Sequence, residues 1–200
     1  SDVPSFFQKY FRCVTITTSG DSVVITSKGL PPHRSFYYDN SDPNYTDYVS
    51  QGNGYYKNPN AIAEQSITIT IPNNPTPKGL TINDNLVDGE VGSSTDEYGM
   101  GTQGVALDSV ALFNPLAAPG DDIEDELFSF DPYNGHPQNS GTYHYHTTTM
   151  GPLEVLEAAG LTSVTTPGEA AIEIYGIMCD GTVVLGCTEL NGDTPDPSDF

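Results

Sequence analysis

Apolar and polar residues alternate with a period of two in several short segments of the chain. In the segment 13–27, Val14 and Ile16 alternate with threonines, and a Ser-Gly-Asp turn at 19–21 divides the segment into two predicted strands. Further strands of similar composition are predicted at 66–72, 105–113 and 171–178. Side chains that alternate in this way occupy the two faces of a sheet in turn, so the pattern predicts sheets with one buried face.

A helical pattern is found in one segment, near 152–159. A proline stands in its first turn, a glutamate follows early, and Gly160 comes directly after its end. The 20 glycines and 16 prolines of the chain favour turns over long helices elsewhere. The predicted fold class is therefore mainly β: a β-sandwich with immunoglobulin-like elements and one short helix near 152–159.

The length of 200 residues suffices for one large β domain or for two small ones. Residues 1–20 are interpreted as an N-terminal arm or strand, and residues 21–200 as the β domain that it joins. A division of that domain into two β subdomains near 78–104 is the alternative, because a long polar loop occupies most of this stretch.

The arm concentrates aromatic residues close to the N-terminus. Its apolar side chains are Phe6, Phe7, Tyr10, Phe11, Val14 and Ile16. As a strand, it would direct Phe7 and Phe11 to one face and the other two aromatic side chains to the opposite face, so both faces require burial. The arm is then either an edge strand of its own subunit or a strand donated to an open sheet edge of another copy. Donation joins copies head to tail and predicts a fibre unless the contacts close into a ring.

The net charge of the chain restricts the classes of molecule that it can bind. There are 6 Lys and Arg against 27 Asp and Glu, a formal net charge of −21, and all 6 cations lie before Gly79. Such a surface repels phosphate backbones and anionic lipid, which argues against nucleic acid and the anionic membrane surface as partners. No apolar run approaches the roughly 18 residues that a membrane span requires, so no membrane span is expected.

The acidic composition also bears on location and on calcium. It is typical of an extracellular protein, and a chain that begins at Ser1 rather than Met indicates a mature, processed product. The expected location is therefore extracellular or the cell surface. Acidic loops at 38–48 and 83–97 are candidate calcium sites, which would suit an adhesion module. Asn44 begins an N-glycosylation sequon in the first of these loops.

The three cysteines are Cys13, Cys179 and Cys187. The Asp180-Gly181 pair predicts a hairpin turn that separates Cys179 from Cys187 by more than the roughly 7 Å a disulfide allows. A single bridge would therefore join Cys13 to either of the other two. Three unpaired thiols are the alternative.

Two histidines stand two residues apart in the segment 142–147. In a strand, His144 and His146 point to one face and the flanking tyrosines to the other, and imidazoles so arranged bind zinc or copper in known proteins. The turn after His136 would fold that residue back beside them, and Asp131 is close enough to serve as a fourth ligand. The alternative is that these polar side chains hydrogen-bond across loops and stabilise the sheet.

The sequence DPYNGHPQNSGTYHYH, residues 131–146, closely resembles the signature of the YHYH-domain family. Further segments that resemble motifs of this family are 25–33, 58–77, 104–117 and 174–186, so that the resemblance covers about 21–187. All four histidines fall on its motif positions, which adds His33 to the candidate ligands His136, His144 and His146. The resemblance implies a mainly β protein that is secreted or located at the cell surface. Two cysteines usual in the family near the tetrapeptide are absent here, which implies the loss of a local disulfide.

The expected function follows from the arm and the histidines together. The chain shows no nucleophile elbow, phosphate loop or recognisable pair of catalytic carboxylates, so no catalytic residue is assigned and an enzyme is not favoured. We expect a self-assembling extracellular structural protein, the subunit of a surface filament or pilus-like fibre joined by its N-terminal strand. The alternative is a binder of copper or zinc, or a metal-dependent extracellular enzyme that uses the histidine cluster.

Overall fold

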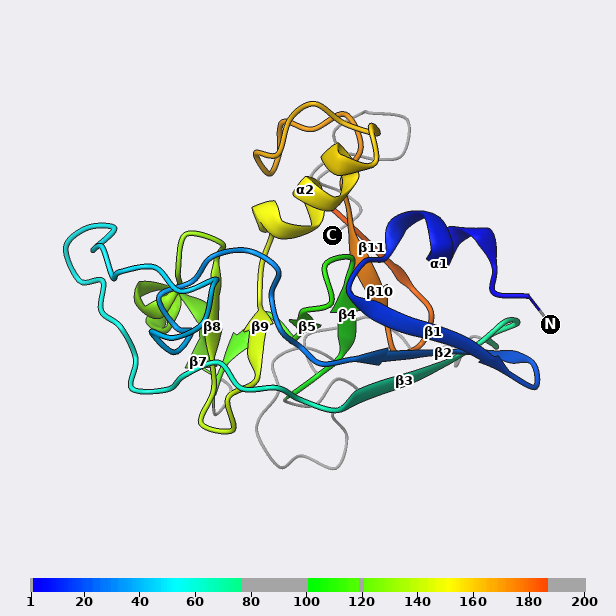
Figure 1. Ribbon diagram of the computed structural model, residues 1–200, viewed down its shortest axis with the longest axis horizontal. Helices are drawn as coiled ribbons and strands as arrows, with labels where there is room; N and C mark the ends of the chain where they lie inside the picture. The colour runs from blue at the N-terminus through cyan, green and yellow to red at the C-terminus, as the bar shows by residue number, and fades with distance from the viewer. Residues whose placement is uncertain (1, 77–100, 119–120, 187–200) are drawn as a thin grey trace.

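The computed structural model describes residues 2–76, 101–118 and 121–186, and it is mainly β. A three-stranded antiparallel sheet has the order β1-β2-β3 (Figure 1). Its strands are β1 (Val14–Ser19), β2 (Ser22–Ser27) and β3 (Ile67–Pro72). The turn between β1 and β2 has Gly20 at a φ of 56°, a left-handed conformation that glycine adopts without strain.

The second sheet has six strands in the order β11-β10-β4-β5-β9-β8. Their bounds are β11 (Val183–Leu185), β10 (Ile174–Met178), β4 (Gly104–Ala106), β5 (Ala111–Leu112), β9 (Tyr143–Tyr145) and β8 (Gly135–Pro137). All neighbours are antiparallel except β5 and β9, which run parallel. Beside this sheet lie the small pair β6 (Leu116–Ala117) and β7 (Asp121–Asp122) and the 3-10 helices η2 (Ile123–Asp125) and η3 (Leu127–Ser129).

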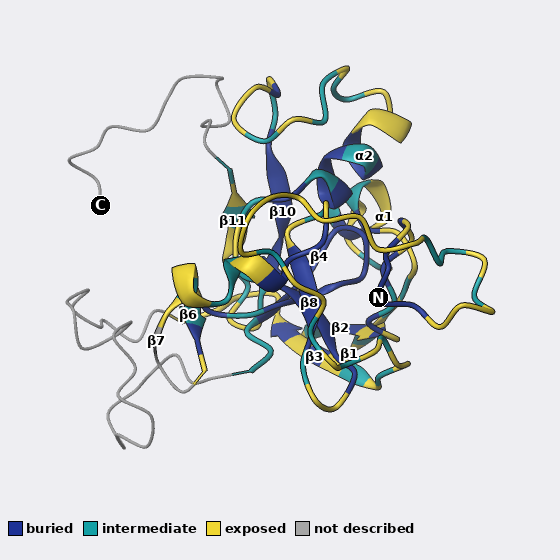
Figure 2. Cartoon of the chain, turned by 90° about the vertical axis from the view of Figure 1, so that its left-hand side faces the viewer, coloured by how far each residue is buried: buried dark blue, intermediate teal, exposed yellow. Residues whose placement is uncertain are grey.

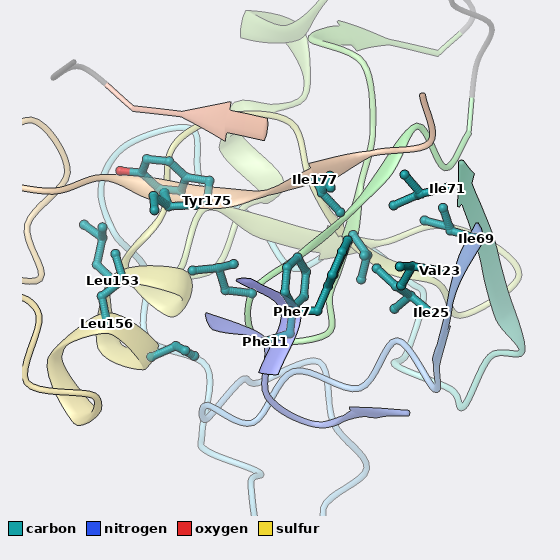
Figure 3. Close-up of a cluster of buried hydrophobic side chains, with 14 of the residues drawn as sticks. Phe7, Phe11, Val23, Ile25, Ile69, Ile71, Leu153, Leu156, Tyr175 and Ile177 are labelled. Atoms are coloured by element: carbon teal, nitrogen blue, oxygen red, sulfur yellow. The ribbon is translucent and has the colours of Figure 1, made fainter. Parts of the chain in front are cut away.

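The two sheets share one hydrophobic core, which confirms the predicted β-sandwich. Val23 and Ile25 of β2 and Ile69 and Ile71 of β3 are buried, whereas the threonines that alternate with them in β3 are exposed. Figure 3 shows these side chains in one cluster with Ile177 of β10. Each fully buried aliphatic side chain of this kind contributes about 1.5–3 kcal/mol. The strand β10 is almost wholly buried (Figure 2).

The predicted helix is α2 (Met150–Ala158), and its ends follow from local chemistry. The side chain of Thr149 caps its start by accepting a hydrogen bond from the amide of Gly151, and Gly160 follows its end with a φ of 71°. Leu153 and Leu156 are fully buried against the shared core (Figure 3).

The segment 105–113, predicted as one strand, forms a hairpin instead. The strands β4 and β5 pair with each other across a tight turn in which the amide of Ser109 donates to the carbonyl of Ala106. The prediction was wrong because both strands of the hairpin are buried, so their apolar residues read as one continuous run. The Asp108-Ser109 pair at the centre is the turn.

The first part of the arm is a helix, α1 (Ser5–Tyr10), and the prediction of a strand there was wrong. Phe7 and Phe11 are four residues apart, so a helical turn brings both to one face, where they are buried in the shared core with ring centroids 5.7 Å apart. Phe6 and Tyr10 are partly buried beside them, and Val14 and Ile16 continue in β1. The chain thus packs its arm on its own domain, while donation of the arm to another copy stays a prediction.

The cysteine prediction is partly wrong. Cys13 and Cys179 are free and exposed, so they do not form the disulfide considered for them, and Cys187 lies outside the described residues. Cys13 precedes β1 at the edge of one sheet and Cys179 follows β10 in the other, which keeps them apart. Within the ranges given above, no helix is long and apolar enough to cross a membrane. The division considered near 78–104 falls mostly outside those ranges.

Candidate metal centre

Strand pairing brings three histidines onto one face of the six-stranded sheet. His136 in β8 lies directly opposite His144 in β9, and directly opposed residues of an antiparallel pair share a face. His146 follows two residues after His144 and therefore returns to that face. One nitrogen from each of the three buried rings lies within 4.8 Å of the others. The structure thus brings three of the predicted site residues together.

The nitrogens that face one another are the Nε2 atoms. The Nε2 atom of His144 lies 3.1 Å from that of His136 and 2.9 Å from that of His146. Two nitrogens that bind one tetrahedral zinc ion, each at about 2.0–2.1 Å, stand about 3.3 Å apart. A small widening of the cluster would therefore admit an ion.

The opposite ring nitrogens of two of these histidines face backbone carbonyls. The Nδ1 atom of His144 lies 3.0 Å from the carbonyl oxygen of Thr142, and that of His146 lies 2.6 Å from the carbonyl oxygen of Asn114. A carbonyl oxygen only accepts hydrogen bonds, so both Nδ1 atoms carry the proton and donate it. Both Nε2 atoms are consequently unprotonated in the neutral rings.

The third histidine reaches the same state through a hydroxyl group. The Nδ1 atom of His136 lies 2.6 Å from Oγ of Ser129, and this hydroxyl already donates its one proton to the carbonyl oxygen of Glu126 at 2.9 Å. Ser129 can therefore only accept from His136. The result is a cluster of three bare Nε2 lone pairs that point at one another.

Burial keeps these rings neutral. It lowers the pKa of His136 to about 3, with the neighbouring His146 acting in the same direction. It also lowers the pKa of His144, aided by the other two histidines, and that of His146. Neutral imidazole is the form that binds a metal ion, so the cluster is competent near pH 7 without losing protons.

Aromatic side chains fix the ring planes. Phe113, which follows β5, stacks on His144 with 3.9 Å between ring centroids, and Phe130 meets His136 edge to face at 4.9 Å. The cluster opens into a cavity of about 520 Å³ that is also lined by Tyr56, Asn58, Asn60, Gln138 and Glu126. A small molecule can therefore reach the histidines from this side.

Glu126 is a member of the site that the sequence did not indicate. Its Oε2 atom lies 3.5 Å from Nε2 of His136. Desolvation raises the pKa of this carboxyl group, against a lowering by the backbone amide of Ala118, which donates to it. Glu126 lies between two 3-10 helices in an acidic stretch, and nothing in that pattern separates it from solvated acids.

Asp131 and His33 lie on the other face of β9, so the prediction that they join the histidine cluster is wrong. Asp131 accepts a hydrogen bond from Tyr143 at 2.8 Å and another from Ser35 at 2.6 Å. His33 lies 2.9 Å from the hydroxyl of Tyr145 and stacks on Tyr133. Both residues therefore contact the tyrosines of the tetrapeptide, which alternate with its histidines.

The side chains of His33, Tyr145 and Asp108 form a row of hydrogen bonds, and the number of available protons determines which group donates in each bond. The tyrosine hydroxyl lies 2.9 Å from Nε2 of His33 and 2.8 Å from Oδ2 of Asp108, but it has one proton for the two contacts. Nδ1 of His33 faces the carbonyl oxygen of Arg34, so its Nε2 is an acceptor in the neutral ring. Both bonds form together when Asp108 carries a proton, and burial raises the pKa of this carboxyl group to about 6.

The acidic loops do not add a second cluster among the described residues. The three histidines are the group found there whose ligand atoms lie close enough to hold a metal ion, and no set of three acids in 38–48 comes together. Asp39 accepts hydrogen bonds from Ser41, and Asp42 accepts one from the amide of Asn44, so both carboxylates stabilise their own turns. The other candidate calcium loop, 83–97, lies outside the described residues.

A comparison with protein families adds one finding. A family model described as "YHYH protein" matches residues 68–194, more than half of the chain. The match includes all three clustered histidines and Glu126, but it begins after His33. No curated protein and no solved structure matches the chain.

Proposed function

The chain belongs to the YHYH protein family, and from this premise we propose that it binds one transition-metal ion, zinc or copper, between His136, His144 and His146. The tetrapeptide from which the family takes its name supplies two of these ligands. The third comes from β8, which pairs with the tetrapeptide strand.

The observation that carries this proposal is the orientation of the three rings. Each imidazole donates its Nδ1 proton to an oxygen of the protein, and each bare Nε2 points to a common centre. Three converging lone pairs repel one another unless a cation lies between them. Metal-binding histidines characteristically donate their second nitrogen to a carbonyl, carboxylate or water, which fixes the tautomer and raises the basicity of the ligand.

Imidazole groups suit zinc and copper better than calcium or magnesium, which prefer oxygen ligands. A metal held by three imidazoles and facing a cavity can also take a water molecule or a small anion from solution. The proposal is therefore a binding site that exchanges a ligand with the cavity. An extracellular or cell-surface location remains part of the proposal.

Metal analysis tests this function. The purified protein, stripped with a chelator and then incubated with zinc or copper and dialysed, should retain about one ion per chain, as the three imidazoles converge on one centre. The double variant His144→Ala and His146→Ala should retain none. The matched control is His33→Ala, which removes a buried histidine on the other face of β9 and should leave the stoichiometry unchanged. Equal metal in the double variant and the wild type would refute the proposal.

The filament prediction has less support from the geometry. The side chains expected to be donated, Phe7 and Phe11, are buried in the core of their own chain. Light scattering on the whole chain tests the prediction directly: very large species that disappear when residues 1–12 are removed would support assembly through the arm. A monomer in both cases would leave the arm as part of its own domain.

A further inference from the structure

The carboxylate of Glu126 lies at the edge of the three-histidine cluster, next to His136. Its Oε2 atom lies 3.5 Å from Nε2 of His136, and its side chain is 31% exposed against 6% for that histidine. It also lines the cavity into which the cluster opens. Glu126 is thus placed between the buried nitrogens and the solvent.

The contact between Glu126 and His136 is not a hydrogen bond. The proton of His136 is on Nδ1, where it is donated to Ser129, so Nε2 and the carboxylate oxygen approach each other with lone pairs only. The separation of 3.5 Å also exceeds the 2.7–3.2 Å usual for a nitrogen–oxygen hydrogen bond. A fourth electron-rich atom therefore lies beside Nε2 of His136, outside the set of three nitrogens that lie within 4.8 Å of one another.

The separation fits two ligands of one ion. A nitrogen and an oxygen that both bind a tetrahedral zinc ion at about 2.0–2.2 Å stand about 3.4 Å apart. The distance from His136 is therefore that of two ligands of one ion, and the partly exposed side chain has to approach the other two nitrogens to complete the ligand set.

We propose that Glu126 is the fourth ligand of the metal, so that the centre is a three-histidine, one-carboxylate site for a divalent ion such as zinc. This inference rests on the proposed function, because it requires that the histidines bind a metal. A hard carboxylate ligand favours a divalent ion over Cu(I), which prefers soft sulfur ligands. As the most exposed of the four, Glu126 is also the ligand that an incoming anion from the cavity would displace.

The surroundings of Glu126 hold it for this role. The backbone amide of Ala118 donates to its carboxylate, and its own carbonyl oxygen accepts from Ser129, the residue that orients His136. One residue thus contacts the centre directly and fixes a second ligand through a hydroxyl group. Such outer contacts are the usual means by which a ligand is oriented before metal binds.

The experiment is a zinc titration of the chelator-stripped full chain against a chromophoric competitor, with cobalt as a spectroscopic probe. We expect Glu126→Gln to weaken zinc binding at least about 10-fold, in line with the loss of a ligand or its support, and to change the visible absorption of bound cobalt. Glu124→Gln is the matched control, because Glu124 is an exposed acid two residues away whose backbone amide donates to the capping side chain of Asp122. It should leave both readouts unchanged.

The variant Glu126→Asp separates ligation from simple attraction between charges. It keeps the negative charge but withdraws the carboxylate by about 1.5 Å, one carbon–carbon bond. Ligation predicts weaker zinc binding in this variant too, whereas attraction alone predicts wild-type affinity. Wild-type affinity in Glu126→Asp, or equal affinities in Glu126→Gln and Glu124→Gln, would overturn the inference and leave the three-histidine site intact. A wild-type chain that binds no metal would overturn the proposed function itself.

Discussion

The substitution Tyr145→Phe removes one hydroxyl group from the centre of a buried chain. That hydroxyl lies between Nε2 of His33 and Oδ2 of Asp108, at 2.9 and 2.8 Å, and Tyr145 is 1% exposed. At pH 5, where Asp108 carries its proton and both hydrogen bonds form, removal of the hydroxyl deprives two buried polar groups of a partner at once. A buried donor or acceptor left unsatisfied costs about 1–3 kcal/mol, so the loss of both bonds should lower the free energy of unfolding by about 4 kcal/mol.

The matched control is Tyr143→Phe, two residues earlier in the same strand. Tyr143 is equally buried, and its hydroxyl donates to Oδ1 of Asp131 at 2.8 Å. That oxygen still accepts from the amide of Tyr133, and the other carboxylate oxygen accepts from Ser35, so nothing is left unsatisfied. The loss is one hydrogen bond, about 1 kcal/mol.

Urea unfolding followed by circular dichroism measures both costs. The two variants should show the same dependence on urea as the wild type, which permits a two-state comparison of free energies. Their metal content should be unchanged, because neither hydroxyl faces the histidine cluster. Equal destabilisation by the two variants, or a larger effect of Tyr143→Phe, would show that the proton count at Asp108 is wrong.

Three further predictions concern the metal site, the N-terminal helix and Asp131. Zinc at 100 times its Kd should raise the free energy of unfolding by about 2.7 kcal/mol, a gain that a chelator reverses and that the double histidine variant lacks. Phe7→Ala should cost about 3–5 kcal/mol in urea unfolding at any protein concentration, whereas Ser5→Ala on the exposed side of the same helix should cost little; a cost that varies with concentration would instead indicate a donated arm. Burial raises the pKa of Asp131 to about 6 from 3.8, so its contribution to stability is full below pH 3.8 and is lost as the pH rises through 6. The stability of the wild type relative to Asp131→Asn should therefore decline between pH 4 and 7 by at most about 3 kcal/mol, and a difference that does not vary with pH would contradict this reasoning.

The parts of the fold that the sequence predicts are those with a clear local period. The alternation of Ile67, Ile69 and Ile71 with threonines matches β3, and the proline in the first turn and the glycine after the end match α2. The arm was misjudged because Phe7 and Phe11 fit both periods: four residues apart, they share a face in a strand and in a helix. Only packing against the core decides between them.

The part of the site that strand geometry determines, the grouping of the three histidines, could be predicted from the sequence. The turn after His136 returns the chain antiparallel, which places His136 opposite His144. Asp131 and His33 were misplaced because closeness in sequence, or membership of a motif, does not say which face a side chain occupies. Glu126 lies in an irregular segment whose position depends on contacts distant in the chain, and no period in the sequence reveals it.

The side chains on both faces of β9 have specific polar partners, and these partners specify the register in which β9 pairs with β8. A slip of one residue would turn the tyrosines toward His136 and the histidines toward Asp108 and Asp131, which would leave both groups of partners unsatisfied at once. Because the histidines and tyrosines alternate along a single strand, a one-residue slip cannot keep the partners of one set while it loses those of the other. If the histidines bind a metal ion as proposed, metal present while the chain folds would therefore favour the native alignment of β8 and β9, and the four-residue motif would specify strand register in addition to binding the ion.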